Sequence, residues 1–321
     1  MKALIKIRSL KKYFQVHDGF LSQSKKTVKA VDDVSLDIRR GEILGLVGES
    51  GCGKTTLGRM SINLITPTSG EVFFDGVNIL KLKNSTLSSL RPKLQIIFQD
   101  PFSSLNPRFT VERIIGEGMI VHGLATKSNL RSKVTEIMQK VGLPNSFMNR
   151  YPHEFSGGQR QRIGIARALS LNPRYLVCDE PVSALDVSIQ AQIINLLQEL
   201  QEKQNLSILF ISHDLNVVKH LSKRTAVMYL GQIVETAPTK ILNKNAAHPY
   251  TRALLAAKPS INPKVKNDNN PLKGDVPSPL NPPAGCQFHP RCPEVTERCK
   301  TEKPLTTFIE EQHTVKCHLY S

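Results

Sequence analysis

The sequence predicts an α/β fold with a small cysteine-rich appendage, and three observations support this prediction. An apolar run at residues 43–47 leads directly into a glycine-rich loop and then a helical pattern. A second apolar run, residues 175–178, ends in two acidic residues. Beyond Lys258 the composition changes, because prolines crowd the chain and four cysteines follow. Short buried strands that alternate with helical patterns are typical of a sheet covered by helices.

The composition of the 321-residue chain limits the class of protein. With 40% apolar residues the chain is able to bury a core, which excludes general disorder. No run of 18 apolar residues is present to cross a membrane, and the N-terminus is too polar for a secretory signal peptide. We therefore expect a cytosolic protein whose thiols are reduced.

The net charge of +16 is unevenly distributed along the chain. Residues 1–258 carry 35 basic and 20 acidic side chains, whereas residues 259–321 carry 8 and 7. Such an excess makes nucleic acid or an anionic membrane surface the first partners to consider. A basic surface that serves only solubility is the simpler alternative.

Residues 48–55, with the sequence GESGCGKT, fit the phosphate-binding P-loop pattern. The strand before them and the helix after them aim backbone N–H groups at a phosphate. Lys54 then neutralises β- and γ-phosphate charge, and the Thr55 hydroxyl is suited to Mg²⁺. A chance glycine-rich turn is the alternative, and it does not explain the flanking elements.

The second strand ends at Cys178, Asp179 and Glu180. The tips of parallel strands line the crevice where α/β sheets bind ligands. Asp179 is therefore a candidate for the Mg²⁺ shell, and Glu180 for the base that activates water. Two solvated acids at a strand end would be an equally good interpretation without the P-loop. We interpret Cys178 as a core residue.

Two further features gain meaning only together with the P-loop. Residues 155–159 open an arginine-rich helix with Ser-Gly-Gly, which presents free N–H groups suited to phosphate. Alone, this would be an ordinary helix N-cap. His213 follows the apolar strand at residues 208–212, where it is positioned to donate to a γ-phosphate. A lone histidine after a strand is more often structural.

Residues 4–258 resemble the ATP-binding subunits of ABC transporters. The motifs appear in family order: Walker A at 48–56, the Q-loop Gln99, the signature at 155–159, Walker B at 175–179 with Glu180 beside it, the D-loop at 183–186, and His213. The signature begins with Phe155, where leucine is commoner in the family. This hydrophobic exchange leaves Ser156 and Gly158 intact.

The resemblance implies a RecA-like P-loop NTPase core with an antiparallel β subdomain, contributed by the N-terminus, and a helical subdomain at about residues 100–172. We predict an amphipathic helix at 131–142. A further helix at 189–204 is predicted to bury Ile193, Leu196, Leu197 and Leu200. The expected domains are an ATP-binding domain, 1–258, and a proline-rich linker with a four-cysteine extension, 259–321.

The resemblance also implies the roles of individual residues. Two nucleotide-binding domains are expected to close head to tail around two ATP molecules, with hydrolysis catalysed by Glu180, His213 and Gln99. Mg²⁺ is assigned to Thr55, Gln99 and Asp179. The aromatic residue that stacks on adenine is expected to be Phe14, with Tyr13 as the alternative. The complete nucleotide-binding set is Phe14, Gly48, Glu49, Ser50, Gly51, Cys52, Gly53, Lys54, Thr55, Thr56, Ser156, Gly157, Gly158, Gln159 and Asp186.

Three segments indicate the cargo. Residues 99–108, 248–255 and 274–293 are similar to segments of di- and oligopeptide importers. Nickel and glutathione importers share much of this pattern and remain alternatives. The implied partners are two integral-membrane permease subunits, a second and different ATP-binding subunit, and indirectly an extracytoplasmic peptide-binding protein. The implied location is the cytoplasmic face of the cell membrane, as a peripheral subunit.

Two other classes of function compete with transport. The first is an ABC ATPase that acts on DNA or ribosomes, which the charge invites. Only about 120 residues separate the two Walker motifs, too few for the long coiled coils of chromosome ATPases, and the chain has one P-loop. We therefore expect no nucleic-acid partner. The second is a redox-sensing iron–sulfur protein, against which the complete catalytic set argues.

The four late cysteines are Cys286, Cys292, Cys299 and Cys317. Disulfides are not expected in a cytosolic tail, and soft thiolates suit Zn²⁺ or an iron–sulfur cluster. The close C-x₂₋₄-C pairs usual for zinc are absent. The family resemblance implies a 4Fe–4S cluster with all four as ligands; Zn²⁺ and free thiols are the alternatives. His289, His313 and His318 lie nearby as substitute ligands or solvated neighbours.

Cys52 differs from these four because it lies inside the P-loop. A helix N-terminus lowers the pKa of a nearby thiol, so we expect a lowered pKa for Cys52. We also expect alkylation of Cys52 to block ATP binding, and bound ATP to protect the thiol from a maleimide.

Overall fold

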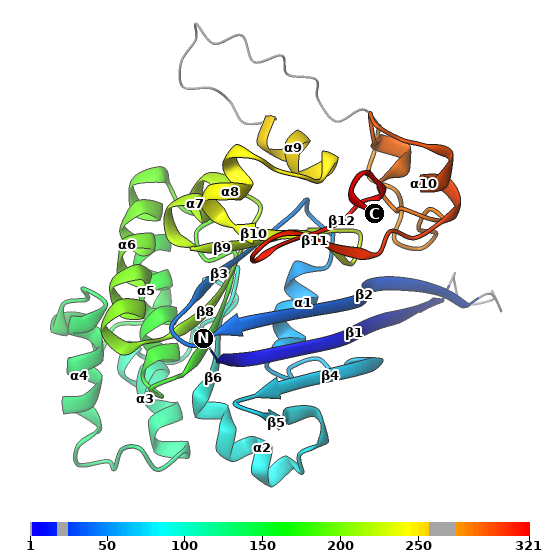
Figure 1. Ribbon diagram of the computed structural model, residues 1–321. Coiled ribbons are helices and arrows are strands. Elements are labelled where there is room, and N and C mark those ends of the chain that lie inside the picture. Colours follow the sequence, from blue (N-terminus) through cyan, green and yellow to red (C-terminus); the bar gives the residue numbers. More distant parts are fainter. Residues whose placement is uncertain (1, 18–24, 257–273) are drawn as a thin grey trace, which may run out of the picture. The chain divides into compact units, whose positions relative to one another are not determined.

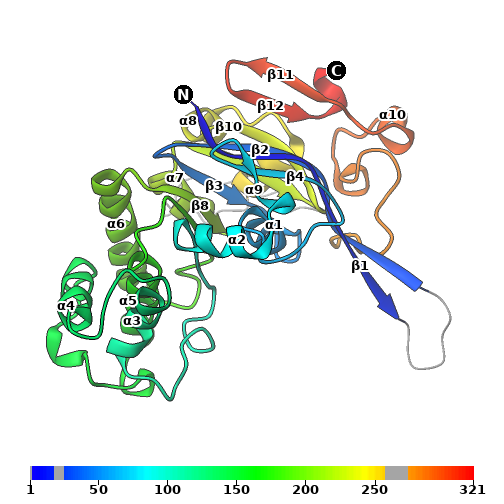
Figure 2. The same cartoon turned by 90° about the horizontal axis from the view of Figure 1, so that it is seen from below.

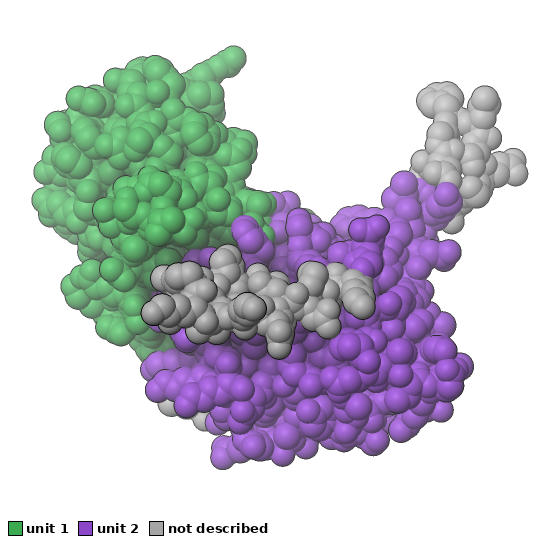
Figure 3. All heavy atoms as spheres, turned by 90° about the horizontal axis from the view of Figure 1, so that it is seen from above, with its two compact units in different colours: residues 1–5, 38–43, 74–212 green, residues 6–37, 44–73, 213–321 purple. Residues whose placement is uncertain are grey.

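The computed structural model describes residues 2–17, 25–256 and 274–321. The chain divides into two compact units, shown in green and purple in Figure 3. The first comprises residues 1–5, 38–43 and 74–212, and the second comprises residues 6–37, 44–73 and 213–321. Most of the linker expected after Lys258 falls at 257–273, outside the described residues.

The first unit contains three neighbouring parallel strands, with β7 (Tyr175–Asp179) between β6 (Leu94–Ile97) and β8 (Ser207–Ser212). Every residue of β7 and β8 is buried. A parallel sheet covered on both faces requires such continuous burial, which explains the apolar runs in the sequence. The strands expected at 175–180 and 208–212 are therefore present within one residue.

Helices make up much of the first unit. The helix α3 (Val111–Val121) packs against α4 (Leu130–Lys140) and α5 (Gly157–Leu169), and the three lie side by side in Figure 2. The helix predicted at 131–142 is α4, and its apolar side is buried through Val134, Ile137 and Met138. The unit also contains α2 (Asn84–Leu90), the short strand β5 (Val77–Asn78), and 3₁₀ turns at Ile79–Lys81, Arg91–Lys93, Asn145–Phe147 and Pro152–Glu154.

The helix α6 (Val187–Gln204) completes the first unit. Its buried residues are Ile193, Leu196, Leu197 and Leu200, which confirms the predicted apolar face. Asp186 caps its N-terminus by accepting a hydrogen bond from the backbone N–H of Ile189. Asn205 ends the helix in the left-handed conformation, a common way to stop an α-helix.

The second unit contains the long strands β1 (Ala3–His17) and β2 (Lys25–Arg39), which lie next to each other and run in opposite directions (Figure 1). The strand β4 (Ser69–Phe74) follows β1 in the same sheet. The first residues of β1 and the last residues of β2 and β4 belong to the first unit. The remaining helices of the second unit are α1 (Lys54–Ser61), α7 (Leu215–Leu221), α8 (Thr239–Lys244), α9 (Pro249–Ala256) and α10 (Glu297–Thr301).

A second sheet in this unit joins the C-terminal residues to the body of the protein. The strand β3 (Ile43–Val47) pairs in parallel with β9 (Arg224–Tyr229), and β10 (Gln232–Pro238) pairs antiparallel with β9. The hairpin of β11 (Thr306–Glu310) and β12 (His313–Lys316) continues the sheet, because β12 pairs antiparallel with β10. Figures 1 and 2 show this hairpin beside β10. The cysteine-rich segment therefore shares a sheet with the strands that follow His213.

Candidate nucleotide site

The P-loop connects β3 to α1 and is pressed between two other backbone segments of the second unit. Gly48 has a φ of 157°, and a Cβ atom there would lie 2.1 Å from the carbonyl oxygen of Met228. Gly53 has a φ of 104°, and its Cβ would lie 2.1 Å from the carbonyl oxygen of Ala30. Because neither carbonyl is able to withdraw like a flexible side chain, only glycine fits at these two positions.

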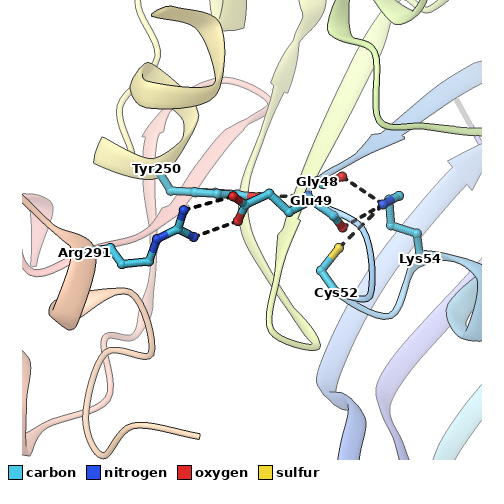
Figure 4. Close-up of polar contacts among 6 residues, drawn as sticks. All are labelled: Gly48, Glu49, Cys52, Lys54, Tyr250 and Arg291. Atoms are coloured by element: carbon cyan, nitrogen blue, oxygen red, sulfur yellow. Dashed lines mark hydrogen bonds and ion pairs between the residues drawn. The ribbon is translucent and has the colours of Figure 1, made fainter. Parts of the chain in front are cut away.

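Lys54 begins α1 and is 4% exposed. Its ammonium group donates to the carbonyl oxygens of Gly48 and Glu49, at 2.8 and 2.9 Å (Figure 4). A buried cation needs such acceptors. Ser50 and Gly51 complete the loop, and Thr55 and Thr56 lie in the first turn of α1.

Glu49 is held by residues that sequence reasoning did not assign to the site. Its backbone N–H donates to the hydroxyl of Tyr250 at 2.9 Å, and its carboxylate accepts two hydrogen bonds from Arg291 (Figure 4). These partners lie 201 and 242 residues further along the chain. No spacing rule connects positions so distant. In the sequence, Tyr250 and Arg291 fall only inside the segments 248–255 and 274–293, which are similar to peptide importers.

The two acidic residues predicted for Mg²⁺ and for the catalytic base are neighbours in the first unit. Asp179 ends β7 and is fully buried, and Glu180 follows with a φ of 46°. This left-handed conformation is unusual for glutamate and is the kind of strain found at functional sites. The side-chain amide of Gln99 donates to the Glu180 carboxylate at 3.1 Å. The structure therefore brings Gln99 to the predicted base.

The predicted signature residues form the N-terminus of α5. Ser156 accepts a hydrogen bond from the N–H of Gln159, and the Gln159 side chain accepts one from the N–H of Ser156, which is a capping box. A Cβ at Gly158 would lie 2.6 Å from the Cγ2 of Ile189, so glycine here permits close packing against α6. Phe155 is buried against Phe147, with ring centroids 5.0 Å apart.

The other predicted contacts stand at the ends of strands and helices. His213 is an exposed residue directly after β8, and Asp186 is the N-cap of α6. Hydrogen bonds from Ser188 and from the Ile189 N–H lower the pKa of Asp186. Of the two aromatic candidates for adenine, Tyr13 donates its hydroxyl hydrogen to Asp32, whereas Phe14 is 38% exposed. This difference favours Phe14.

The prediction of a lowered pKa for Cys52 is wrong. Its side chain is only 3% exposed, and burial raises the pKa of the thiol despite the nearby Lys54 ammonium group, whose nitrogen lies 3.9 Å from the sulfur. Desolvation of the thiolate therefore outweighs both the helix N-terminus and the lysine charge. Cys178 is fully buried in β7, as its interpretation as a core residue requires.

The four late cysteines line one cavity, together with His289 and His318. Burial raises the pKa of Cys286 to about 11 and raises those of Cys292 and Cys317. Within residues 2–17, 25–256 and 274–321, however, no group of three or more His, Cys, Asp or Glu side chains is arranged to hold a metal ion. The expected 4Fe–4S cluster is therefore not supported by the arrangement of the side chains. His313 does not line this cavity and bonds to Glu235 instead.

The strand–loop–helix geometry of the P-loop, together with the Gln99–Glu180 pair, defines an ATP-binding cassette. Comparison with known proteins agrees. The chain matches the ABC transporter family over residues 31–183 and the "Oligopeptide/dipeptide transporter, C-terminal region" over residues 234–299.

Two relatives and two solved structures illustrate the match. The oligopeptide transport ATP-binding protein AppF of Bacillus subtilis is 52% identical over 100% of this chain and 98% of its own length. A putative peptide import ATP-binding protein of Brucella ovis is 48% identical over 98% and 97%. The dimeric ATP-binding cassette MJ0796, in a post-hydrolysis state bound to ADP and Pi, is 28% identical over 73% of this chain and 98% of its own, with a TM-score of 0.66. The protein cbiO1 from Clostridium perfringens is 25% identical over 77% and 93%, with a TM-score of 0.65.

The chain therefore belongs to the ABC transporter family, in the group of oligopeptide and peptide transport ATP-binding proteins, and is an ABC-type ATPase. In the part of the chain that the structure describes, no helix is both long and apolar enough to cross a membrane.

Proposed function

We propose that this chain hydrolyses ATP to power the uptake of di- and oligopeptides by an ABC importer. The observation that supports this most strongly is the Gln99–Glu180 contact at the tip of β7, in a chain whose C-terminal region is of the oligopeptide and dipeptide type. Uptake of nickel or glutathione is the alternative, because this chain hydrolyses ATP and other subunits select the cargo.

The nucleotide is bound by the P-loop, where Lys54 leaves the carbonyls of Gly48 and Glu49 to neutralise the β- and γ-phosphates. The exposed ring of Phe14 stacks on adenine. Residues 48–53 surround the phosphates with backbone N–H groups. Three side chains supply oxygen ligands suited to Mg²⁺: the hydroxyl of Thr55, the carboxylate of Asp179 and the amide oxygen of Gln99. When bound, Mg²⁺ supplies charge neutralisation of the phosphates.

Hydrolysis depends on three residues. Glu180 orients and deprotonates the attacking water, and its strained backbone fixes the direction of the carboxylate. Gln99 holds that carboxylate through its amide and responds to the membrane subunit. His213, exposed after β8, donates to the γ-phosphate.

A second ATP-binding subunit completes the site. The signature residues Ser156, Gly157, Gly158 and Gln159, together with Asp186, face the P-loop of that subunit across a head-to-tail dimer. The description of MJ0796 as a dimer supports this arrangement by analogy. The second subunit is a different chain, and the pair docks on two integral-membrane permease subunits at the cytoplasmic face of the cell membrane. An extracytoplasmic peptide-binding protein delivers the cargo.

The complex tests this proposal directly. We expect affinity purification of the full chain from membranes to retain two permease subunits and a second ATP-binding subunit, identified by mass spectrometry. Reconstituted vesicles should take up labelled dipeptides only with ATP, and not nickel or glutathione. ATP-dependent uptake of either alternative cargo, with none of peptide, would contradict the cargo assignment.

We propose further that Cys286, Cys292, Cys299 and Cys317 bind a 4Fe–4S cluster, with Zn²⁺ as the alternative. The support is that all four thiols line one cavity and that soft thiolates select these metals. A bound cluster would cross-link Cys286, Cys292 and Cys299, which precede the β11–β12 hairpin, to Cys317, which follows it. Anaerobically purified protein should be brown, absorb near 400 nm and contain about four iron atoms per chain; a colourless protein with one Zn²⁺ favours the alternative, and a metal-free protein excludes both.

A further inference from the structure

The contact between the C-terminal region and the P-loop has a consequence for ATP binding. We propose that Arg291 is a positioning residue of the ATP site, which fixes the P-loop through Glu49. Arg291 lies among the cysteines of the C-terminal region and does not touch the reacting atoms itself. The proposal rests on ATP binding at the P-loop, and its test does not depend on the identity of the cargo.

The ion pair has the geometry of a specific, buried contact. The two terminal nitrogens of Arg291 donate to separate oxygens of the Glu49 carboxylate, at 2.8 and 3.0 Å. The Arg291 side chain is 5% exposed and that of Glu49 is 24% exposed. A two-pronged arginine–carboxylate contact fixes direction as well as distance, and burial protects it from screening by salt. The carboxylate also raises the pKa of Arg291, which keeps the guanidinium charged.

Arg291 is itself held rigidly. It ends a 3₁₀ turn (His289–Arg291), and its N–H donates to the carbonyl of Phe288 at 3.0 Å. The guanidinium carbon lies 5.9 Å from the centre of the Tyr229 ring. Phe288 packs against Tyr229 and Tyr250, with ring centroids 5.3 and 5.4 Å apart. We call Tyr229, Tyr250 and Phe288 the aromatic cluster; all three are at most 1% exposed.

The aromatic cluster and Arg291 hold Glu49 at two different points. The Tyr250 hydroxyl accepts from the Glu49 N–H, while Arg291 binds the carboxylate. The Glu49 carbonyl is left to face Lys54, which donates to it at 2.9 Å. Figure 4 shows this chain of contacts from Arg291 through Glu49 to Lys54. The position of the phosphate-binding lysine therefore depends on a contact supplied from the far end of the sequence.

Charge gives the contact a second effect. Glu49 places a carboxylate inside a loop that binds a polyanion, and Arg291 neutralises it. Without Arg291, the Glu49 carboxylate would repel the phosphates and the loop would lose its anchor. Both effects weaken ATP binding, and they are separable by mutation because only the repulsion requires the charge on Glu49.

The test compares ATP binding and hydrolysis by full-length variants in the assembled complex. Arg291→Met should weaken ATP affinity by roughly tenfold or more, measured as Kd and as KM, with kcat changed much less. Arg291→Lys, which keeps the charge but loses the two-pronged contact, should be intermediate. The control is Arg298→Met, which removes an exposed ion pair with Glu302 in the same region and should leave both constants unchanged.

A double variant separates anchoring from repulsion. Glu49→Gln combined with Arg291→Met removes the unpaired carboxylate, so its Kd should fall below that of Arg291→Met but stay above that of the unmutated protein. The same variant leaves no lone buried charge and serves as the test if Arg291→Met fails to fold. The proposal is overturned if Arg291→Lys and Arg291→Met both bind ATP with the Kd of the unmutated protein. It is also overturned if the double variant has that Kd, because Arg291 would then only neutralise the charge of Glu49.

Discussion

Glu235 lies at the centre of the contacts that attach the C-terminal strands, and we predict how much stability the protein loses when its side chain is removed. The side chain is 1% exposed and accepts three hydrogen bonds: from the N–H of Ala247 at 2.8 Å, from the N–H of His248 at 3.0 Å, and from the Nε2 of His313 at 2.8 Å. These donors come from the segment before α9 and from β12. Glu235 therefore joins three segments of the second unit.

The expected cost follows from the number of bonds. Leaving a buried donor without its acceptor costs about 1–3 kcal/mol, and Glu235→Ala leaves three such donors. With partial relaxation and entry of water, we expect the free energy of unfolding of the protein to fall by about 3–6 kcal/mol. His313→Gln keeps an amide donor facing Glu235 and should cost about 1 kcal/mol or less.

Two measurements test this: urea unfolding gives the free energies of unfolding, and amide hydrogen exchange shows which segments lose protection. The m-value must stay constant for the two variants to be compared as free energies. In Glu235→Ala, the amides of β12 and of residues 247–248 should lose protection before those of β9 do. If Glu235→Ala were no less stable than His313→Gln, the three hydrogen bonds would not carry the attachment and this reasoning would be wrong.

Four other predictions follow from individual residues. Glu180→Gln should bind ATP normally but hydrolyse it slower by a factor on the order of 10² to 10⁴, and an unmutated rate would remove Glu180 from the mechanism. Burial lowers the pKa of His248 to about 3, so below pH 6.5 the unfolded chain binds a proton that the native state does not. The free energy of unfolding should therefore fall as the pH drops from about 6.5 towards 3, and His248→Asn should flatten this slope. Gly158→Ala should destabilise α5 against α6, and Ile189→Ala should relieve the clash in the double variant; calorimetric Tm values that show no such rescue would exclude this contact as the cause. Buried Cys52 should react slowly with a maleimide, and ATP should slow it further; equal labelling rates with and without ATP would contradict protection.

The local elements were predictable because each is encoded by neighbouring residues. The apolar face of α6 follows from a 3.6-residue period, and the four residues expected to be buried are the ones that are buried. The P-loop was equally clear, since its glycines, its lysine and its flanking elements are contiguous. Gln99 and Glu180 were each identified from their motifs, although their 3.1 Å contact was not.

Cys52 shows where local reasoning fails. Its position before a helix argues for a lowered pKa, but the surrounding protein removes water from the thiol, and desolvation has the opposite and larger effect. Burial depends on which segments cover a residue, and those segments are distant in sequence. The cysteine tail presents the same difficulty, because the family resemblance implied four ligands and could not position them.

The sequence by itself determined the ATP-binding and hydrolysis motifs: the phosphate loop, its lysine, the acidic pair at the tip of β7 and the signature helix. These depend on short-range patterns that backbone geometry converts directly into structure. Only the tertiary structure decided which residues surround these motifs. Arg291 meets Glu49, Tyr250 meets the Glu49 N–H, and Glu235 meets His313 across 242, 201 and 78 residues of chain. Such pairs are set by strand order and packing, for which no local pattern in one sequence is a substitute.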